Sequence, residues 1–404
     1  MGAKQVSSKS PPSKAMPVLT TDIAIIGAGV GGCIAAIALH QALGENCTIT
    51  LIEKSDQAKT PQHETHQTPV KAGENLPPAA ERILKKLGLY RRFISANQQG
   101  HMAQASMGMQ SYWGNDQRQI VDNLSNPDGF GWQLNRSAFE KFLNECATEQ
   151  GVKIHWSTTV CESIRHEEYW KCQLQTGEDR INLNAKFIID ASGRRASFAR
   201  QQGAKRQALD RQVAYWATIA NNTENQLSTI VTCPYGWWYS AALPNQQRVV
   251  ALHTFSDLVP KNLRKNVYDF LMLARAIPQI APLISTSVNY HGVTAANTCR
   301  MSQVAGSHWA AIGDAAVAFD PLSSQGMFNA MATAMQLSDL IKASDILNTE
   351  SLPQRENQEK SIEHAYEKQI DSIWRHYLGH WQHYYQQEKR WLDQTYWRER
   401  NSFA

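Results

Sequence analysis

The sequence lacks the marks of several large protein classes. Its seven cysteines are scattered over 404 residues and never form a Cys-x-x-Cys pair, which argues against a disulfide framework or a zinc site. The net charge is only +4, so we expect no surface built for nucleic acid. No apolar run reaches the roughly 18 residues that a membrane-spanning helix needs. We therefore expect a protein of a reducing, cytoplasmic setting with no membrane partner.

Two polar segments also lack the signals of ordered structure. Residues 1–20 contain lysines but no apolar stretch of a secretion signal, and we expect a disordered leader there. Residues 55–68 contain almost no large apolar side chain, which predicts a long solvated loop. His63 and His66 lie in this loop with only Glu64 nearby as a further ligand, so we expect no metal site.

The first recognisable pattern in the sequence is a strand, a glycine-rich turn and a helix. Residues 22–26 and 48–52 are short apolar runs typical of buried strands, and residues 33–43 have the composition of a helix. The pattern Gly-x-Gly-x-x-Gly between the first strand and the helix lets backbone N–H groups approach a pyrophosphate. Glu53, at the end of the second strand, can accept hydrogen bonds from an adenosine ribose. The predicted dinucleotide contacts are Gly27, Gly29, Val30, Gly31, Gly32, Glu53 and Lys54.

A second pattern favours FAD over NAD. Residues 309–312 are typical of a strand, and residues 326–342 are typical of a helix. Asp314 directly after the strand suits the ribityl hydroxyls of a flavin. The N-terminus of the following helix suits the flavin's pyrimidine edge, where a reduced flavin concentrates negative charge. The predicted contacts at this end are Gly313, Asp314, Pro321, Ser324, Gly326 and Met327.

The order of these segments predicts an α/β fold with two layers. Residues 211–256 alternate with period two, which predicts an antiparallel sheet on the substrate side. The tail carries four of the twelve tryptophans in its last 31 residues and predicts aromatic helices, which either pack on the body or dock a protein. The expected division is an FAD-binding Rossmann domain from residues 21–98, 136–204 and 290–345, a substrate domain from residues 99–135 and 205–289, and a helical region from residues 346–404.

Three motifs in this order resemble a known superfamily. They are the glycine turn, the segment Asp190-Ala191-Ser192-Gly193 after an apolar strand, and the Gly313-Asp314 segment. Together they resemble the single-component FAD hydroxylases of the para-hydroxybenzoate hydroxylase type, the flavin-dependent tryptophan halogenases and the geranylgeranyl reductases. The resemblance implies a glutathione-reductase-like FAD domain beside an antiparallel substrate sheet, with the Asp190 segment near the pyrophosphate. It also implies FAD contacts from Arg136 and Val160.

One branch of this superfamily is especially similar. Residues 71–78, 236–244 and 319–326 resemble the halogenase-related flavoproteins. Among these, the chain is most similar to the flavoproteins encoded beside quinoprotein amino-acid oxidases, which are needed to build cysteine tryptophylquinone. This resemblance implies a quinoprotein oxidase precursor as partner. It also implies a substrate pocket that includes Glu74, Trp237, Trp238 and Tyr239.

Two departures from the halogenases favour hydroxylation. Ser323 stands where they carry a catalytic glutamate, and residues 104–112, where their active-site lysine falls, contain no lysine. We therefore expect an FAD-dependent monooxygenase that uses NAD(P)H as a transient reductant and O2 as co-substrate, with a tryptophan side chain of the precursor as substrate. A hydroxylase of a small indole or phenol, a prenyl-chain reductase and a non-catalytic assembly factor stay as alternatives. The sequence assigns no catalytic residue, and we expect His253, His291 and His308 to be structural.

Overall fold

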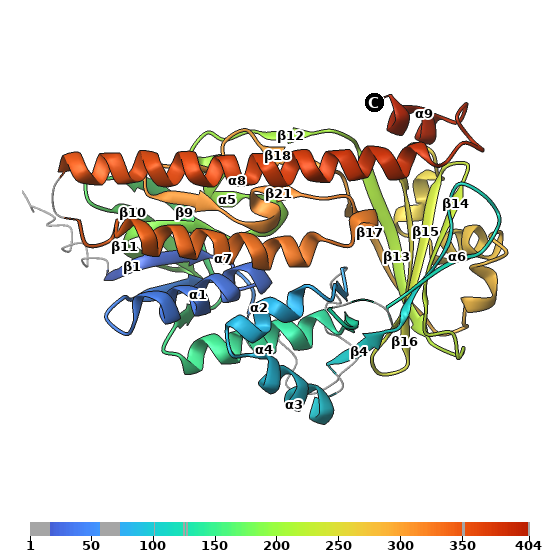
Figure 1. Ribbon diagram of the computed structural model, residues 1–404, viewed down its shortest axis with the longest axis horizontal. Helices are drawn as coiled ribbons and strands as arrows, with labels where there is room; N and C mark the ends of the chain where they lie inside the picture. Colours follow the sequence, from blue (N-terminus) through green and yellow to red (C-terminus); the bar gives the residue numbers. More distant parts are fainter. Residues whose placement is uncertain are drawn as a thin grey trace, which may run out of the picture.

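Figure 1 shows the computed structural model of the protein. It describes residues 17–56, 73–100, 102–123, 126, 128–349 and 352–402. Most of the predicted leader and of the predicted polar loop lies outside the described residues, as do His63 and His66. In the described part, no helix combines the length and the apolar character needed to cross a membrane. The seven cysteines all fall within it and are free thiols.

The first layer is a mostly parallel sheet that begins with β1 (Val18–Ile26). This strand pairs in parallel with β2 (Ile49–Ile52) on one side and with the end of β11 (Asp179–Asp190) on the other. Residues 23–25 are fully buried, because helices and strands cover both faces of the sheet here. The remaining strands are β8 (Lys153–His155), β9 (Thr158–Arg165), β10 (Trp170–Thr176), β19 (Ala305–Gly306) and β20 (Trp309–Ala311). The predicted βαβ unit and the predicted strand at residues 309–312 are thus confirmed.

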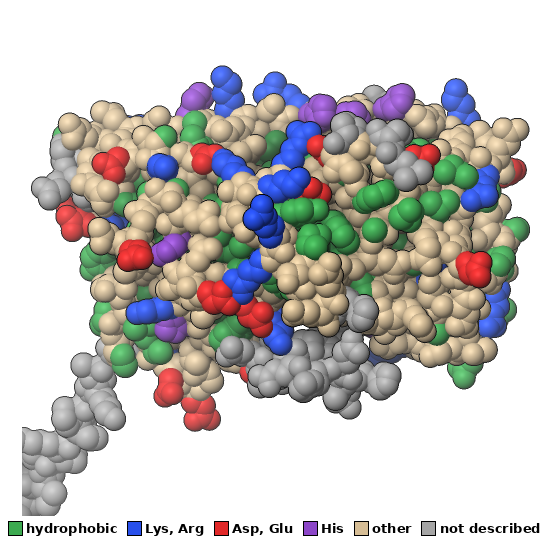
Figure 2. Space-filling model, turned by 60° about the horizontal axis from the view of Figure 1, so that its bottom comes forward, with side chains coloured by type: hydrophobic (Ala, Val, Ile, Leu, Met, Phe, Trp, Pro, Cys, Tyr) green, Lys and Arg blue, Asp and Glu red, His purple; other side chains and the backbone are tan. Residues whose placement is uncertain are grey.

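Helices α1 (Val30–Leu43), α4 (Arg136–Glu149) and α7 (Gly326–Ser344) pack together over this sheet. Helix α1 begins directly after the glycine turn that follows β1, and α7 begins after the Asp314 loop that follows β20, as the two glycine-containing motifs predict. The short helices α2 (Ala80–Lys86), α3 (Tyr90–Gly100) and α5 (Ser197–Gln201) lie beside them. Charges of both signs share the surface. On the face in Figure 2, Lys and Arg side chains form a band near the middle, with acidic and hydrophobic side chains next to it.

The second layer is a seven-stranded, largely antiparallel sheet in the order β17-β13-β16-β15-β14-β5-β6. Its strands are β5 (Gly108–Tyr112), β6 (Gln119–Asp122), β13 (Gln212–Ala220), β14 (Ser228–Cys233), β15 (Gly236–Leu243), β16 (Gln247–Phe255) and β17 (Val288–Ala295). The predicted antiparallel sheet is confirmed for β13 to β16. The expected domain boundary at residue 290 falls inside β17, which pairs with β13. This strand therefore belongs to the substrate sheet, and we propose a boundary after it.

Two small sheets connect the layers. One contains β3 (Asn75–Leu76), β7 (Gly131–Leu134) and β4 (Ala103–Ser106), and the other contains β12 (Arg206–Ala208), β18 (Cys299–Met301) and β21 (Val317–Ala318). Helix α6 (Val267–Arg275) covers the outer face of the seven-stranded sheet, where Phe270 contacts Trp238. The other face of this sheet is turned toward the first layer.

The C-terminal region consists of α8 (Leu352–Gln386) and α9 (Thr395–Asn401). Helix α8 extends along both layers in Figure 1. Of the two alternatives for the aromatic tail, packing on the body is the one observed. The buried members are Trp374, Tyr377, Trp381, Tyr385, Tyr396 and Trp397. Tyr384 is 51% exposed, and most of the other rings contact one another or the substrate sheet.

Candidate functional site

A cavity of about 850 Å³ lies between the two layers. It runs from the carboxyl ends of the parallel strands, where α/β proteins usually bind ligands, to the inner face of the antiparallel sheet. Twenty of the sequence-predicted site residues line it. They are Gly27, Gly29, Val30, Gly31, Glu53, Lys54, Glu74, Arg136, Val160, Ala191, Ser192, Gly193, Trp237, Tyr239, Gly313, Asp314, Pro321, Ser324, Gly326 and Met327.

Three predicted site residues do not line the cavity. A Cβ at Gly32 would come within 1.9 Å of the Gly27 carbonyl oxygen, so this glycine serves close packing of the turn. Trp238 is fully buried on the outer face of β15, because successive side chains of a strand point to opposite faces. Its place in a substrate pocket is thereby corrected.

The third is Asp190, whose side chain turns away from the cavity. Its carboxylate accepts hydrogen bonds from the backbone N–H groups of Ser192 (3.0 Å), Phe198 (2.8 Å) and Ala199 (2.9 Å). Burial raises the pKa of this carboxyl, and the hydrogen bonds from the Ser192 hydroxyl at 2.6 Å and from these backbone N–H groups oppose that effect. Asp190 therefore holds the start of α5 and shapes the backbone of Ala191 and Ser192, which do face the cavity.

The glycine turn opens directly on the cavity. Gly27 has a φ of 108° and sits so close to Ala191 that a Cβ would meet its carbonyl oxygen at 2.5 Å. Glu53 fixes the turn, since its carboxylate accepts hydrogen bonds from the N–H groups of Ala28 and Ser55, both at 2.8 Å. A Cβ at Gly29 would meet nothing within 4 Å. Space for a ligand thus lies against the first turn of α1.

The opposite rim is built from the Asp314 loop and the start of α7. Ser324 adopts a left-handed conformation with a φ of 51°, which brings the chain into the helix at Gly326. Asp314 is paired with Arg194 at 3.6 Å. Arg194 also donates to the carbonyl oxygen of Phe319 at 3.1 Å and so ties two cavity-lining segments together. The basic run that includes Arg194 predicts a solvated helix face from sequence, but Arg194 lines the cavity, and its position directly after the Asp190 motif is the available signal.

A carboxyl group and a phenol meet on the wall of the cavity. Glu74 is buried, and its side chain accepts hydrogen bonds from the Gly73 N–H at 3.0 Å and from the hydroxyl of Tyr239. Burial raises the pKa of Glu74 and raises that of Tyr239 well above its usual value. Arg136 donates to the Gly73 carbonyl at 2.7 Å and pairs with Glu140 at 2.8 Å. The wall therefore offers a carboxyl that holds its proton to a higher pH than usual.

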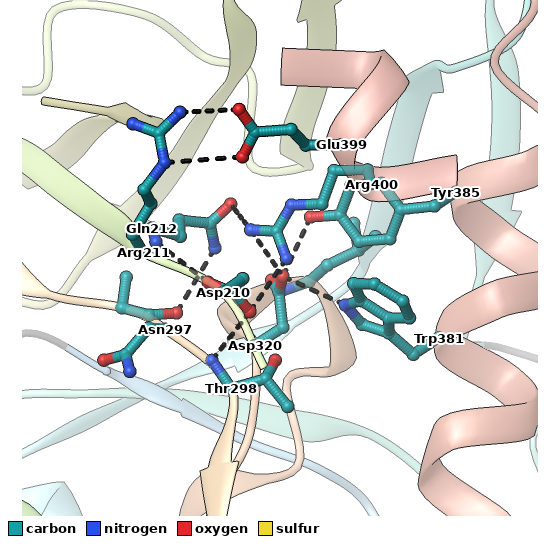
Figure 3. A network of polar contacts seen from close by, with 12 residues as sticks. Asp210, Arg211, Gln212, Asn297, Thr298, Asp320, Trp381, Tyr385, Glu399 and Arg400 are labelled. Carbon is teal, nitrogen blue, oxygen red and sulfur yellow. Dashed lines mark hydrogen bonds and ion pairs between the residues drawn. The ribbon is translucent and has the colours of Figure 1, made fainter. Parts of the chain in front are cut away.

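The C-terminal region supports Trp237 through Tyr385, which belongs to the polar network around Asp320 and Arg400 in Figure 3. Trp237 donates its indole N–H to the hydroxyl of Tyr385 at 3.1 Å, and Tyr385 donates to the carboxylate of Asp320 at 2.8 Å. Arg400 of α9 is fully buried and pairs with Asp210 at 2.9 Å and with Asp320 at 3.4 Å. Helices α8 and α9 thus fix both Trp237 and the loop before α7.

Comparison with known proteins identifies the family. A family model described as an FAD binding domain matches residues 20–270. The chain belongs to this FAD-binding family. It is 24% identical to the FAD-dependent oxidoreductase LodB of Marinomonas mediterranea over 95% of this chain and 97% of that protein.

Solved structures share the fold of this FAD-binding protein. The flavin-dependent halogenase CmlS aligns with a TM-score of 0.77 at 20% identity, over 94% of this chain and 67% of CmlS. The peptidyl tryptophan dihydroxylase QhpG, described as essential for tryptophylquinone cofactor biogenesis, aligns with a TM-score of 0.72 at 21% identity, over 94% of this chain and 78% of QhpG. The predicted fold, an FAD domain beside a substrate sheet as in the hydroxylases and halogenases, is confirmed.

The donor set of the cavity fits FAD. The cavity is lined by the first turns of two helices, α1 and α7, whose N-termini favour negative charge. The free space at Gly29 admits a phosphate close to the backbone. Its far end is an apolar and aromatic sheet face that suits the flavin ring and a second ring next to it.

Proposed function

We propose that this FAD-dependent oxidoreductase is a monooxygenase that hydroxylates a tryptophan side chain in a quinoprotein oxidase precursor during cysteine tryptophylquinone maturation. The observation that supports it most is the single continuous cavity, which joins the glycine turn of the FAD-binding domain to the aromatic face of the antiparallel sheet. A cofactor in the first part and a substrate ring in the second would therefore lie against each other.

The proposed FAD contacts follow the cavity from end to end. The adenosine and pyrophosphate would lie against the glycine turn, Glu53, Lys54 and the Arg136 and Val160 segments, with N–H groups of α1 as donors. The ribityl chain would lie near Asp314, and the flavin ring near the start of α7. Arg194 would hold Asp314 in place through the pair at 3.6 Å.

When bound, FAD supplies electron transfer from NAD(P)H and insertion of one oxygen atom of O2 into the substrate. The chain's own residues supply position and exclusion of water. Trp237 and Tyr239 form the wall against which a flat ring packs. Glu74 lies in hydrogen-bond contact with Tyr239 and is a buried carboxyl on the cavity wall that could exchange a proton with a ligand there.

The choice of substrate rests on relatives and on a departure from the halogenases. QhpG is described as a peptidyl tryptophan dihydroxylase and shares the fold over nearly the whole chain. Ser323 stands at the position of the halogenases' catalytic glutamate and donates its hydroxyl to the Asp320 carbonyl at 2.8 Å. This removes the carboxylate that halogen transfer uses in the resembling proteins and favours transfer of oxygen.

The test is a reaction of the FAD-loaded protein with a quinoprotein oxidase precursor, NAD(P)H and O2. We expect the precursor to gain the mass of oxygen at one tryptophan, with the oxygen coming from isotopically labelled O2. A precursor with phenylalanine at that tryptophan is the matched control and should gain none.

Other outcomes separate the alternatives. If free indole or a phenol is hydroxylated as efficiently as the precursor, the small-aromatic hydroxylase takes the place of the protein-directed enzyme. If the precursor binds and matures without NAD(P)H or O2, the protein is an assembly factor. Either result overturns the proposal.

A further inference from the structure

Arg400 of α9 is a buried guanidinium held between two carboxylates (Figure 3). It pairs with Asp210 at 2.9 Å and with Asp320 at 3.4 Å, and none of the three side chains is more than 1% exposed. Burial by itself lowers the pKa of Arg400, but the tyrosines and aspartates around it raise the pKa well above its usual value, so the group is charged. Buried ion pairs often add little to stability compared with apolar side chains, so this one calls for another explanation.

Asp320 connects this ion pair to the cavity. One oxygen of its carboxylate accepts a hydrogen bond from the Leu322 N–H at 2.9 Å, and the other faces Arg400. The turn that Asp320 begins leads into α7, and residues 319–321 and 324–327 of this segment line the cavity. In the proposed function this is the end of the cavity that receives the flavin ring. A charge on Asp320 therefore acts on that end of the cavity.

The buried charges of this group do not cancel. One guanidinium stands against the two carboxylates of Asp210 and Asp320, so the three side chains together carry one negative charge. Buried charges act on one another more strongly than charges in water, because little water screens them. Arg211 and Glu399, a second ion pair that involves α9, are 45% and 40% exposed and are therefore screened.

We propose that Arg400 raises the reduction potential of the bound flavin by offsetting the negative charge of Asp320. Reduction by two electrons and one proton adds one negative charge to the flavin ring, so a carboxylate near the ring opposes reduction and a guanidinium favours it. Arg400 does not line the cavity and acts through Asp320, so it is a positioning residue. This inference rests on the proposed function, which puts the flavin ring near the start of α7.

The test measures the reduction potential of the FAD-loaded protein without substrate. The protein is reduced slowly under anaerobic conditions by xanthine and xanthine oxidase, in equilibrium with a dye of known potential. Arg400→Met removes the positive charge and should lower the potential. Asp320→Asn removes the negative charge, keeps an oxygen for the Leu322 N–H and should raise the potential. We expect each variant to change the ratio of oxidised to reduced flavin at a fixed potential by about tenfold, which equals about 30 mV for two electrons.

The opposite signs distinguish an effect of charge from a loss of packing, which would shift both variants in the same direction. The double variant Arg400→Met/Asp320→Asn loses both charges, and its potential should lie between those of the two single variants. Glu399→Gln is the matched control on the same helix. It breaks only the exposed pair with Arg211 and should leave the potential unchanged.

The inference is overturned if Asp320→Asn leaves the potential unchanged or lowers it. It is equally overturned if Arg400→Met leaves the potential unchanged or raises it. Should Arg400→Met fail to fold, Asp320→Asn alone decides. The potential is measured without turnover, so the proposed function is judged separately. Opposite shifts without hydroxylation of any precursor would reject the proposed hydroxylation alone, and hydroxylation with unchanged potentials would reject only the role of Arg400.

Discussion

Gly29 and Gly32 belong to the same glycine-rich motif but have different structural roles. Gly32 has no room for a side chain because the Gly27 carbonyl lies against it, whereas Gly29 faces open space in the cavity. One glycine therefore serves the fold and the other serves the ligand. This difference depends on which atoms lie nearby and is not visible in the spacing.

The first prediction separates these tasks by alanine substitution. Gly32→Ala should destabilise the protein by about 1–3 kcal/mol, because a rigid backbone oxygen stands where the Cβ must go. Gly29→Ala should leave the melting temperature of the FAD-free protein unchanged and lower the amount of FAD bound. Thermal unfolding and flavin absorbance per protein measure both effects. Full FAD content in Gly29→Ala would contradict the assignment of the turn to FAD.

The second prediction concerns the acid dependence of stability at His253. The pKa of this residue is lowered to about 3 in the folded protein, from about 6.5 in an unfolded chain. Between these values the unfolded chain binds a proton that the folded protein does not, so stability falls as the pH falls.

Urea unfolding of the unaltered protein and of His253→Phe between about pH 6.5 and pH 4.5 measures this effect. The slope for the unaltered protein should be steeper by up to about 1 kcal/mol per pH unit. Equal slopes would show that the ring takes up its proton in the folded state at an ordinary pH.

At the scale of elements, mutation can test the contact between Trp237 of the substrate sheet and Tyr385 of α8. Tyr385→Phe removes the hydroxyl that accepts from Trp237 and donates to Asp320. The third prediction is a loss of about 1–3 kcal/mol in the free energy of unfolding, since a buried N–H and a buried carboxylate each lose a partner. Tyr384→Phe, one residue away and 51% exposed, should change it by less than about 0.5 kcal/mol. Similar effects of both variants in urea unfolding would contradict this support.

Helices and strands with a clear hydrophobic period in the sequence were predictable. Strands that depend on pairing with distant segments were not. The apolar runs of β1 and β2, the alternation in β13 to β16 and the helix α7 follow from local pattern. The short strands β4 to β7 were missed, because their pairing depends on segments far away in the chain. The boundary expected at residue 290 divides β17 for the same reason, since only its pairing with β13 assigns the strand to the substrate sheet.

At the scale of the whole molecule, the motifs indicated which backbone segments line the cavity, but not the directions of single side chains. Backbone features such as the glycine turn and the start of α7 could be placed from sequence, because strands and helices of this fold converge at one edge. The sequence did not indicate that the Asp190 side chain turns away from the cavity, or that Arg194 and His253 line it. These placements depend on the direction of each side chain, which is determined by tertiary packing.

The fourth prediction concerns the reaction of the whole protein. The resemblance to the halogenases places Ser323 at the position of their catalytic glutamate. We therefore expect no chlorinated or brominated product when the FAD-loaded protein receives tryptophan, a tryptophan-containing peptide or the precursor, with halide, reductant and O2. Mass spectrometry of the products measures this. Ser323→Glu is the companion variant, and halogen incorporation by the unaltered protein would contradict the assignment.

The long helix α8 also connects the two layers. At about 1.5 Å per residue its 35 residues extend over roughly 52 Å. It bonds the first layer through Tyr366, whose hydroxyl donates to the Ala311 carbonyl at 2.7 Å, and the second layer through Tyr385. A hinge opening between the layers would have to break these buried bonds or bend the helix. We therefore expect entry of a cofactor or substrate to depend on local movement of loops, with the two layers staying in place.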